Sequence, residues 1–266
     1  MISAVVLTKN EEEQIEKCLK TLAFCGEIIV IDDFSTDKTA ELAKKYTQKI
    51  YQRRLNDNFA SQRNFGLDKA KGNWIFFVDA DERVPKELQN EILKAAKTKK
   101  YNGFYLKRKD FNWGRWLKHG ETATVKLLRL AKKGKGEWQN PIHEVWQIKP
   151  PIGELKNPLH HYSHTTVSET IKRIDRYSSI RAKMLYQEGK RTNAFEILAF
   201  PVGKFLLNYF LRLGFLDGKA GYLMATFMSI HSFLVKAKLY LLWKNKGQEE
   251  FKIPSLKEVY RLDKQK

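Results

Sequence analysis

The sequence predicts an α/β fold with a mainly parallel central sheet, followed by a C-terminal α-helical extension. In the first 100 residues, short apolar runs alternate with segments of helical spacing, which is the pattern of βαβ units. After Tyr162 the strand-like runs give way to long segments rich in Phe, Leu and Tyr. With 266 residues, of which 42% are hydrophobic, the chain can fill a core of this kind.

Four apolar runs are expected to form the parallel strands. They cover residues 2–8, 27–32, 48–53 and 74–79. The segments with helical spacing cover residues 12–22, 37–46, 59–70 and 86–97. Connections of this length fit right-handed crossovers over one sheet. Residues 103–162 then change to short β-rich pieces separated by Gly, Pro and aromatic residues.

The helical extension is expected to associate with a membrane. Its helical segments cover residues 167–188, 194–216 and 219–243. The longest uncharged run there has 16 residues, whereas a transmembrane helix needs roughly 20. We therefore expect the extension to lie on or dip into a membrane face, with basic residues such as Lys236 and Lys238 facing anionic headgroups. The alternative is a helical pair that packs on the core or on a second subunit, as in a homodimer.

The charge balance and the cysteines narrow the partners and the compartment. The 49 Lys and Arg against 30 Asp and Glu give a formal net charge of +19, which implies an anionic partner such as nucleic acid, an acidic membrane or a phosphorylated substrate. Cys18 and Cys25 have neither metal-ligand spacing nor a disulfide framework. A strand-like run begins at Ile2, so we expect no signal peptide and a reducing cytoplasm.

Two acidic clusters follow two of the expected strands. Asp32 and Asp33 end one apolar run, and Asp79 and Asp81 end another. Because ligands of open α/β sheets bind at the carboxyl ends of strands, both clusters should face one crevice. Carboxylates suit a divalent cation, Mg²⁺ or Mn²⁺, that also binds the phosphates of a substrate. The alternative is that these residues only end strands and cap the following helices.

A series of motifs in this order and spacing resembles the family 2 inverting glycosyltransferases, which have the GT-A-type fold. The motifs are Val5-Val6-Leu7-Thr8-Lys9-Asn10-Glu11-Glu12, Asp32-Asp33-x-Ser35-x-Asp37-x-Thr39, Gln62-Arg63-Asn64-x-Gly66, Ala70-x-Gly72-x-Trp74 and Asp79-Ala80-Asp81-Glu82. Later features resemble the bacterial subgroup that glucosylates the lipopolysaccharide inner core. These features are Pro141-Ile142-His143-Glu144, Leu159-His160-His161-Tyr162, Arg176-Tyr177 and Gly214-Phe215-Leu216-Asp217-Gly218.

The resemblance implies a set of binding residues. The residues implied to bind the nucleotide-sugar are Thr8, Asn10, Glu11, Asp32, Asp33, Arg63, Asp79 and Ala80. Among them, Asp33 would lie nearest the base and Arg63 near the base or the diphosphate. Arg63 could instead be a surface charge on a helix. The residues implied to bind the metal are Asp79, Asp81 and His161.

An inverting transfer also needs a base that removes the proton from the acceptor hydroxyl. Our candidate is Glu144, which stands beside His143 in the β-rich segment. Glu121 is the alternative. The mixed aromatic and basic run 107–118 could bind a phosphorylated glycolipid, or single-stranded nucleic acid by stacking. The acidic clusters would repel a nucleic-acid backbone, so we expect no nucleic acid partner.

Together these observations predict a metal-dependent glycosyltransferase that moves a hexose, with glucose expected, from a UDP-sugar to an anionic glycolipid like the lipopolysaccharide core. Residues 1–165 would form the catalytic domain, with a nucleotide-binding half (1–100) and an acceptor half (101–165), and residues 166–266 a membrane-associating extension. The enzyme would be peripheral on the inner face of the cell membrane. The alternatives are another acceptor, namely a polyprenyl phosphate, a capsule precursor or a protein, or a non-catalytic basic module that binds membranes.

Overall fold

The chain forms two compact units. The computed structural model describes residues 1–141, 144–163 and 166–247. The first unit contains Met1–Thr170 and Leu206–Thr226, and the second contains Ile171–Phe205 and the described residues from Phe227 to Gly247. The central sheet and both acidic clusters belong to the first unit.

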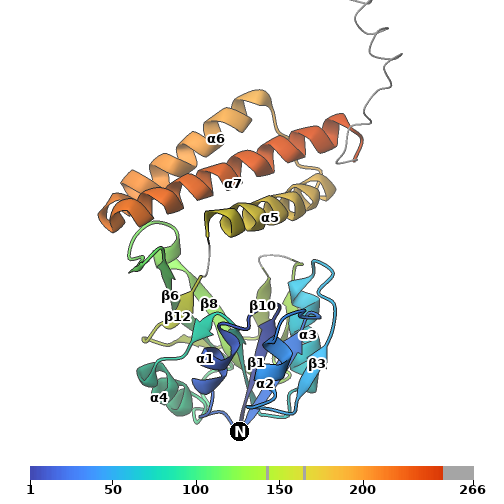
Figure 1. Ribbon diagram of the computed structural model, residues 1–266, viewed down its shortest axis with the longest axis vertical. Coiled ribbons are helices and arrows are strands. Elements are labelled where there is room, and N and C mark those ends of the chain that lie inside the picture. Colours follow the sequence, from blue (N-terminus) through green and yellow to red (C-terminus); the bar gives the residue numbers. More distant parts are fainter. Residues whose placement is uncertain (142–143, 164–165, 248–266) are drawn as a thin grey trace, which may run out of the picture. The chain divides into compact units, whose positions relative to one another are not determined.

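The four predicted parallel strands are confirmed. They are β1 (Ile2–Thr8), β2 (Glu27–Asp32), β3 (Ile50–Gln52) and β4 (Trp74–Asp79), and they lie in the order β3-β2-β1-β4. Figure 1 labels β1 and β3. All neighbours in this series pair in parallel. The central strands are continuous apolar runs because the chain covers both faces of the sheet, as is usual for parallel sheets.

The sheet continues beyond β4 with strands from the β-rich segment. β8 (Lys126–Lys132) pairs antiparallel with β4, β6 (Gly103–Asn112) pairs antiparallel with β8, and β12 (Leu159–Tyr162) pairs parallel with β6. β5 (Glu82–Arg83) completes the series by pairing antiparallel with β12. The remaining strands are β7 (Arg115–Trp116), β9 (Gly136–Gln139), β10 (Val145–Ile148) and β11 (Ile152–Glu154). The predicted fold class, with its mainly parallel central sheet, is therefore correct.

Alternate residues of β1 face two separate hydrophobic clusters. Ala4 and Val6 belong to the cluster that includes side chains of α1 (Ile15–Lys20), α2 (Thr39–Ala43) and α4 (Lys86–Ala95). Val5 and Leu7 belong to the cluster that includes side chains of α3 (Phe59–Lys69). This alternation places α3 on the opposite face of the sheet from α1 and α4.

Between residues 166 and 247, three α-helices form the described part of the predicted C-terminal helical region. They are α5 (Val167–Gln187), α6 (Ala194–Leu206) and α7 (Gly218–Lys244). A π-helical turn at Leu207–Leu211 and a 3₁₀ turn at Gly214–Asp217 connect α6 to α7, so the predicted segment 194–216 is not one continuous helix. The chain turns there because Leu213 takes a left-handed conformation with φ 58°.

Lysines on α7 hold the second unit together. Lys238 donates to Asp175 Oδ1 of α5 at 2.6 Å, and Lys236 donates to Glu196 Oε2 of α6 at 2.6 Å. Ala182 of α5 lies in one apolar cluster with residues of α7. Because Lys236 and Lys238 are paired inside the unit, the expectation that they face lipid headgroups is wrong.

A glycine lets α3 lie close to the sheet. A Cβ on Gly66 would lie 2.5 Å from Val5 Cγ1 and 3.3 Å from Ile31 Cγ1. Both neighbours are fully buried, β-branched side chains with little room to move. This close approach also fixes the position of Arg63, which lies one turn earlier on the same helix.

We expect Gly66→Ala to lower the free energy of unfolding by about 1–3 kcal/mol, because the added methyl group overpacks the contact with β1 and β2. Gly203 of α6 is the matched control, since nothing lies within 4 Å of a Cβ built there. Gly203→Ala should leave stability unchanged or raise it by up to about 1 kcal/mol. Urea unfolding followed by circular dichroism measures both, and an unchanged midpoint for Gly66→Ala would contradict the close contact.

Candidate active site

The carboxyl ends of β1, β2 and β4 lie side by side in the first unit. Thr8 pairs with Asp32 across β1 and β2, and Leu7 pairs with Asp79 across β1 and β4. The backbone N–H of Ala80 donates to Leu7 O at 3.3 Å, which holds the start of the second acidic cluster against β1. The two acidic clusters therefore meet at one edge of the sheet, as the sequence predicted.

The two adjacent aspartates after β2 have different partners. Asp32 is fully buried and accepts hydrogen bonds from Ser35 N at 3.1 Å and Ser35 Oγ at 2.5 Å, so it holds the turn that follows β2. Asp33 accepts from Leu55 N at 3.0 Å and from Lys9 Nζ at 2.8 Å. A role for either residue in nucleotide binding stays a prediction.

The loop after β1 is tied to the loop after β2. Asn10 Oδ1 accepts from Thr36 N at 2.8 Å, and Glu11 N donates to Thr39 Oγ1 at 2.7 Å. Thr8 Oγ1, at the end of β1, is buried and makes no hydrogen bond within the described part of the chain. A buried hydroxyl is normally hydrogen-bonded, so Thr8 has the position and the unused capacity to contact a ligand.

Asp79 lies between two arginines. Its Oδ1 accepts from Arg63 Nη2 at 2.9 Å, and its Oδ2 accepts from Arg129 Nη2 at 2.7 Å. Burial alone would raise the pKa of Asp79, but the guanidinium groups of Arg129 and Arg63 outweigh it and hold the pKa well below its ordinary value. Asp79 is therefore a carboxylate at every physiological pH.

Arg63 connects Asp79 to the candidate base. Its Nε donates to Glu144 Oε1 at 2.9 Å, while its Nη2 contacts Asp79. The guanidinium carbon lies 4.9 Å from the centre of the Trp138 ring, and the side chain is 2% exposed. The alternative of a surface helix charge is therefore wrong, because a buried arginine of this kind needs its two carboxylate partners.

A second carboxylate group forms around His161. Its Nε2 lies 3.0 Å from Asp81 Oδ2, and its Nδ1 lies 2.5 Å from Asp110 Oδ1. Burial lowers the pKa of His161, but Asp81 and Asp110 outweigh burial and raise the pKa to about 10. Burial, together with the negative charge of Asp81, raises the pKa of nearby Glu11 to about 7. This part of the site therefore combines the carboxylates of Asp81, Asp110 and Glu11 with cationic His161 and with Arg108, whose Nε lies 2.9 Å from Asp110 Oδ1.

A divalent cation fits Asp81 and His161 better than it fits Asp79. Asp110 holds the ring nitrogen of His161 that faces away from Asp81, which is how proteins orient metal-binding histidines. Asp79 has an arginine on each of its carboxylate oxygens. Across residues 1–141, 144–163 and 166–247, no group of three or more His, Cys, Asp or Glu is arranged to hold a metal. Two protein ligands plus substrate phosphates would suffice for Mg²⁺.

Three residues of the site escaped the sequence analysis as site residues. Arg129 on β8 is 5% exposed and contacts Asp79, and fully buried Glu82 accepts from Asp79 N at 2.8 Å. Asp110 on β6 is 2% exposed and contacts His161. Arg129 had a sequence signal, since it stands between Leu128 and Leu130 in an apolar strand-forming run, and a charge inside a buried strand has to be paired.

The alternative base, Glu121, belongs to a different group. Asn208 Nδ2 lies 3.5 Å from Glu121 Oε2, and neighbouring His119 Nδ1 lies 3.0 Å from Asp217 Oδ1. Glu144, in contrast, is joined to Asp79 through Arg63. His143 lies outside the described residues. The geometry thus links Glu144 to the acidic clusters, and the assignment of the base stays a prediction.

The parallel strands in the order β3-β2-β1-β4 and the acidic residues at their ends agree with the GT-A-type fold that the motifs implied. The chain belongs to glycosyl transferase family 2, whose family model matches residues 3–148. The resemblance stated from the motifs is therefore confirmed, and the protein is a glycosyltransferase.

Curated relatives match nearly the whole chain. The lipopolysaccharide core biosynthesis glycosyltransferase LpsC of Rhizobium meliloti is 29% identical over 249 residues, which cover 90% of this chain and 92% of LpsC. The uncharacterized glycosyltransferase RT0209 of Rickettsia typhi is 26% identical over 90% of this chain and 86% of its own length. Among solved structures, S. aureus TarS 1–349 aligns over 96% of this chain and 94% of its own, with 16% identity and a TM-score of 0.48.

Proposed function

We propose that this glycosyltransferase is metal-dependent and inverting, and that it moves a hexose, with glucose expected, from a UDP-sugar to a hydroxyl of a glycolipid like the lipopolysaccharide core. The name of the Rhizobium meliloti relative supports the acceptor class. The observation that carries the proposal is the pair of carboxylate groups at the strand ends. One contains Asp81 and His161, and the other joins Asp79 to Glu144 through Arg63.

In this proposal the strand ends bind the UDP part of the donor. The buried hydroxyl of Thr8 and the carboxylate of Asp33 lie at adjacent strand ends, where they can meet a base and a ribose. Asp32 supports Asp33 by holding the turn after β2. The complete set proposed for the nucleotide-sugar is Thr8, Asn10, Glu11, Asp32, Asp33, Arg63, Asp79 and Ala80.

Asp81 and His161 would hold the Mg²⁺ or Mn²⁺ ion, and Asp79 would act mainly through its arginines. When bound, the cation neutralises charge on the diphosphate as it leaves. Asp81, Asp110 and Glu11 place several carboxylates together at this point. A divalent cation bound there would add positive charge facing the diphosphate, beyond the charges of His161 and Arg108 that already pair with Asp81 and Asp110.

The transfer itself is a single displacement. The acceptor oxygen forms a bond to the anomeric carbon on the side opposite the diphosphate, the bond from that carbon to the diphosphate oxygen breaks, and UDP leaves with the electron pair. The hydroxyl proton passes to the carboxylate of Glu144, which Arg63 Nε holds in place at 2.9 Å. One displacement inverts the anomeric configuration. Arg63 therefore fixes the distance between the base and the Asp79 side of the site.

Helix α6 supplies a surface for membrane attachment. Phe195 is 78% exposed and Leu198 is 69% exposed, and Phe200 and Val202 are at least half exposed. Within the described residues, Ala194–Leu211 is long and apolar enough to cross a membrane by length and composition. We propose that residues 166–266 attach the catalytic part, residues 1–165, to the inner face of the cell membrane, with association of two chains through α6 as the alternative.

We expect Asp81→Ala to abolish the Mn²⁺-dependent part of UDP binding and to lower turnover by about 100-fold or more, because it removes a proposed cation ligand. Stability should fall by about 1–3 kcal/mol, because His161 keeps Asp110 but loses its other charged partner, so binding is compared after circular dichroism shows that the variant is folded. Calorimetric titration of UDP with and without Mn²⁺ measures the effect. Asp68→Ala, on the exposed side of α3, is the control. Full Mn²⁺-dependent binding in Asp81→Ala would rule out the metal role.

Glu144→Gln should keep donor binding and lower kcat by about 10²- to 10⁴-fold, because the amide can still accept from Arg63 but cannot take the proton. Transfer to an extracted glycolipid, followed by mass spectrometry, measures the rate. Glu121→Gln is the matched variant and should remain active. The reverse result, an active Glu144→Gln and an inactive Glu121→Gln, would transfer the base role to Glu121.

The double variant Phe195→Ser and Leu198→Ser should weaken binding to anionic lipid vesicles by about tenfold or more, since two large apolar side chains no longer enter the membrane. Leu93→Ser on α4, where the leucine is 39% exposed, is the control. Vesicle sedimentation measures binding. If the double variant instead binds vesicles normally and changes the sedimentation mass of the free protein, α6 is a contact between two chains.

A further inference from the structure

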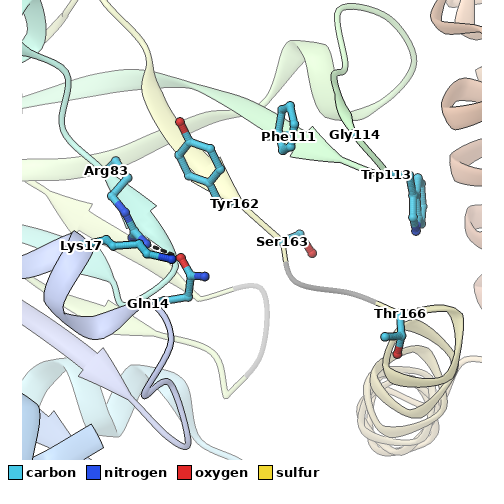
Figure 2. A pocket seen from close by; sticks show the side chains of 9 residues that line it. All are labelled: Gln14, Lys17, Arg83, Phe111, Trp113, Gly114, Tyr162, Ser163 and Thr166. Atoms are coloured by element: carbon cyan, nitrogen blue, oxygen red, sulfur yellow. Dashed lines mark hydrogen bonds between the residues drawn. The ribbon is translucent and has the colours of Figure 1, made fainter.

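The first unit contains a cavity of about 650 Å³ that the proposed chemistry does not use. Figure 2 shows Gln14, Lys17 and Arg83 on one side of it and Tyr162, Phe111 and Trp113 across from them. Gly114, Ser163 and Thr166 complete the described lining. The lining thus combines aromatic rings with basic and amide groups, and none of the described lining residues is acidic.

The cationic side of the cavity is partly preorganised. Arg83 Nη1 donates to Glu82 O at 2.8 Å and Ala80 O at 3.1 Å, and its Nη2 donates to the side chain of Gln14. Its guanidinium carbon lies 5.6 Å from the centre of the Tyr162 ring. Lys17 is exposed at the rim. A fixed guanidinium beside a mobile ammonium is well suited to binding a phosphate or a carboxylate.

The cavity and the proposed cation site use the same short strands. Phe111 follows Asp110 on β6, Tyr162 follows His161 on β12, and Arg83 is the last residue of β5. Because successive residues of a strand point to opposite sides, the two aromatic rings face away from the side that holds Asp110 and His161. A molecule in the cavity would therefore lie on the opposite face of these strands from Asp110 and His161 and would not coordinate the cation.

We propose that this cavity binds a sugar ring that carries a phosphate or a carboxylate, and that this ring belongs to the acceptor at a position remote from the reacting hydroxyl. The rings of Tyr162, Phe111 and Trp113 offer apolar surface to the ring carbons, and Arg83 and Lys17 meet the anionic group. This inference rests on the proposed function, because it assigns the ring to the acceptor of the transfer. Binding energy from remote parts of a substrate positions its reacting group.

Two variants test the proposed contacts, one with the anionic group and one with the sugar ring. Lys17→Glu reverses the charge at the rim, and Lys94→Glu is its control, since Lys94 is also a basic residue in the last turn of a helix and does not line the cavity. Trp113→Ala removes an aromatic face from the turn between β6 and β7, outside the three buried clusters. Arg83 is left unchanged because it holds the backbone next to Asp81.

Ligand-detected NMR on the full chain gives the first readout, with glucose 6-phosphate, glucuronic acid, glucose, inorganic phosphate and UDP as probes. We expect the two anionic sugars to bind. Lys17→Glu and Trp113→Ala should each lower their affinity by about tenfold, which is the scale of one lost charged contact, and Lys94→Glu should leave the affinity unchanged. If neutral glucose binds as tightly as the two anionic sugars, the proposal that the cavity recognises an anionic group is wrong. If inorganic phosphate alone binds as tightly as the anionic sugars, the proposal that the cavity recognises a sugar ring is wrong. If Trp113→Ala loses UDP binding, the cavity belongs to the donor site.

The second readout separates this inference from the proposed function. In transfer to an anionic glycolipid, Lys17→Glu should raise the KM for the acceptor about tenfold and leave kcat and the KM for the donor unchanged, which is the signature of lost ground-state binding. An unchanged acceptor KM in an active enzyme would overturn the inference alone. If no UDP-sugar is turned over at all, the proposed function fails, while the NMR result still decides whether the cavity binds anionic sugars.

Discussion

The arrangement of the catalytic face depends on the buried ion pairs around Asp79. Arg63 comes from α3, Arg129 from β8 and Glu144 from the segment before β10, and all are joined through Asp79 or Arg63. Moving charges of this kind out of water costs several kcal/mol each, and the cost is recovered only when every charge has its partner. Each element is therefore held at the position that completes the network.

The two aspartates of the D-x-D motif have different partners because β4 ends at Asp79, before Asp81. Residues i and i+2 of one strand share a face, which is why the spacing predicted a common metal. β4 ends at Asp79, however, and Asp81 belongs to the turn that leads to β5. Asp79 consequently meets arginines, whereas Asp81 meets His161 across the β5–β12 pair. Local backbone geometry thus gives the two aspartates different partners, and their roles stay predictions.

The sequence predicted the local structure well and the long-range partners poorly. Strands buried on both faces have to be apolar throughout, so their positions could be predicted to within two residues. Arg129 contacts a residue 50 positions earlier, and Asp110 contacts one 51 positions later, because sheet pairing brings them together. No single-sequence pattern encodes that pairing. Arg63 was ambiguous for the same reason, since its two partners, Asp79 and Glu144, lie 16 and 81 positions away.

The charge distribution explains why a strongly basic protein keeps an acidic centre. In the proposed function, the net charge of +19 would attract a polyanionic acceptor and the lipid surface that carries it, and Arg83 and Lys17 would extend this cationic character to the edge of the site. The same charge would draw a nucleotide diphosphate to many places on the protein. In the proposed function, Glu11, Asp81 and Asp110 would favour phosphate that arrives with a divalent cation, while His161 and Arg108 balance part of their charge. An acidic centre in a basic protein would thus restrict productive donor binding to the metal-bound form.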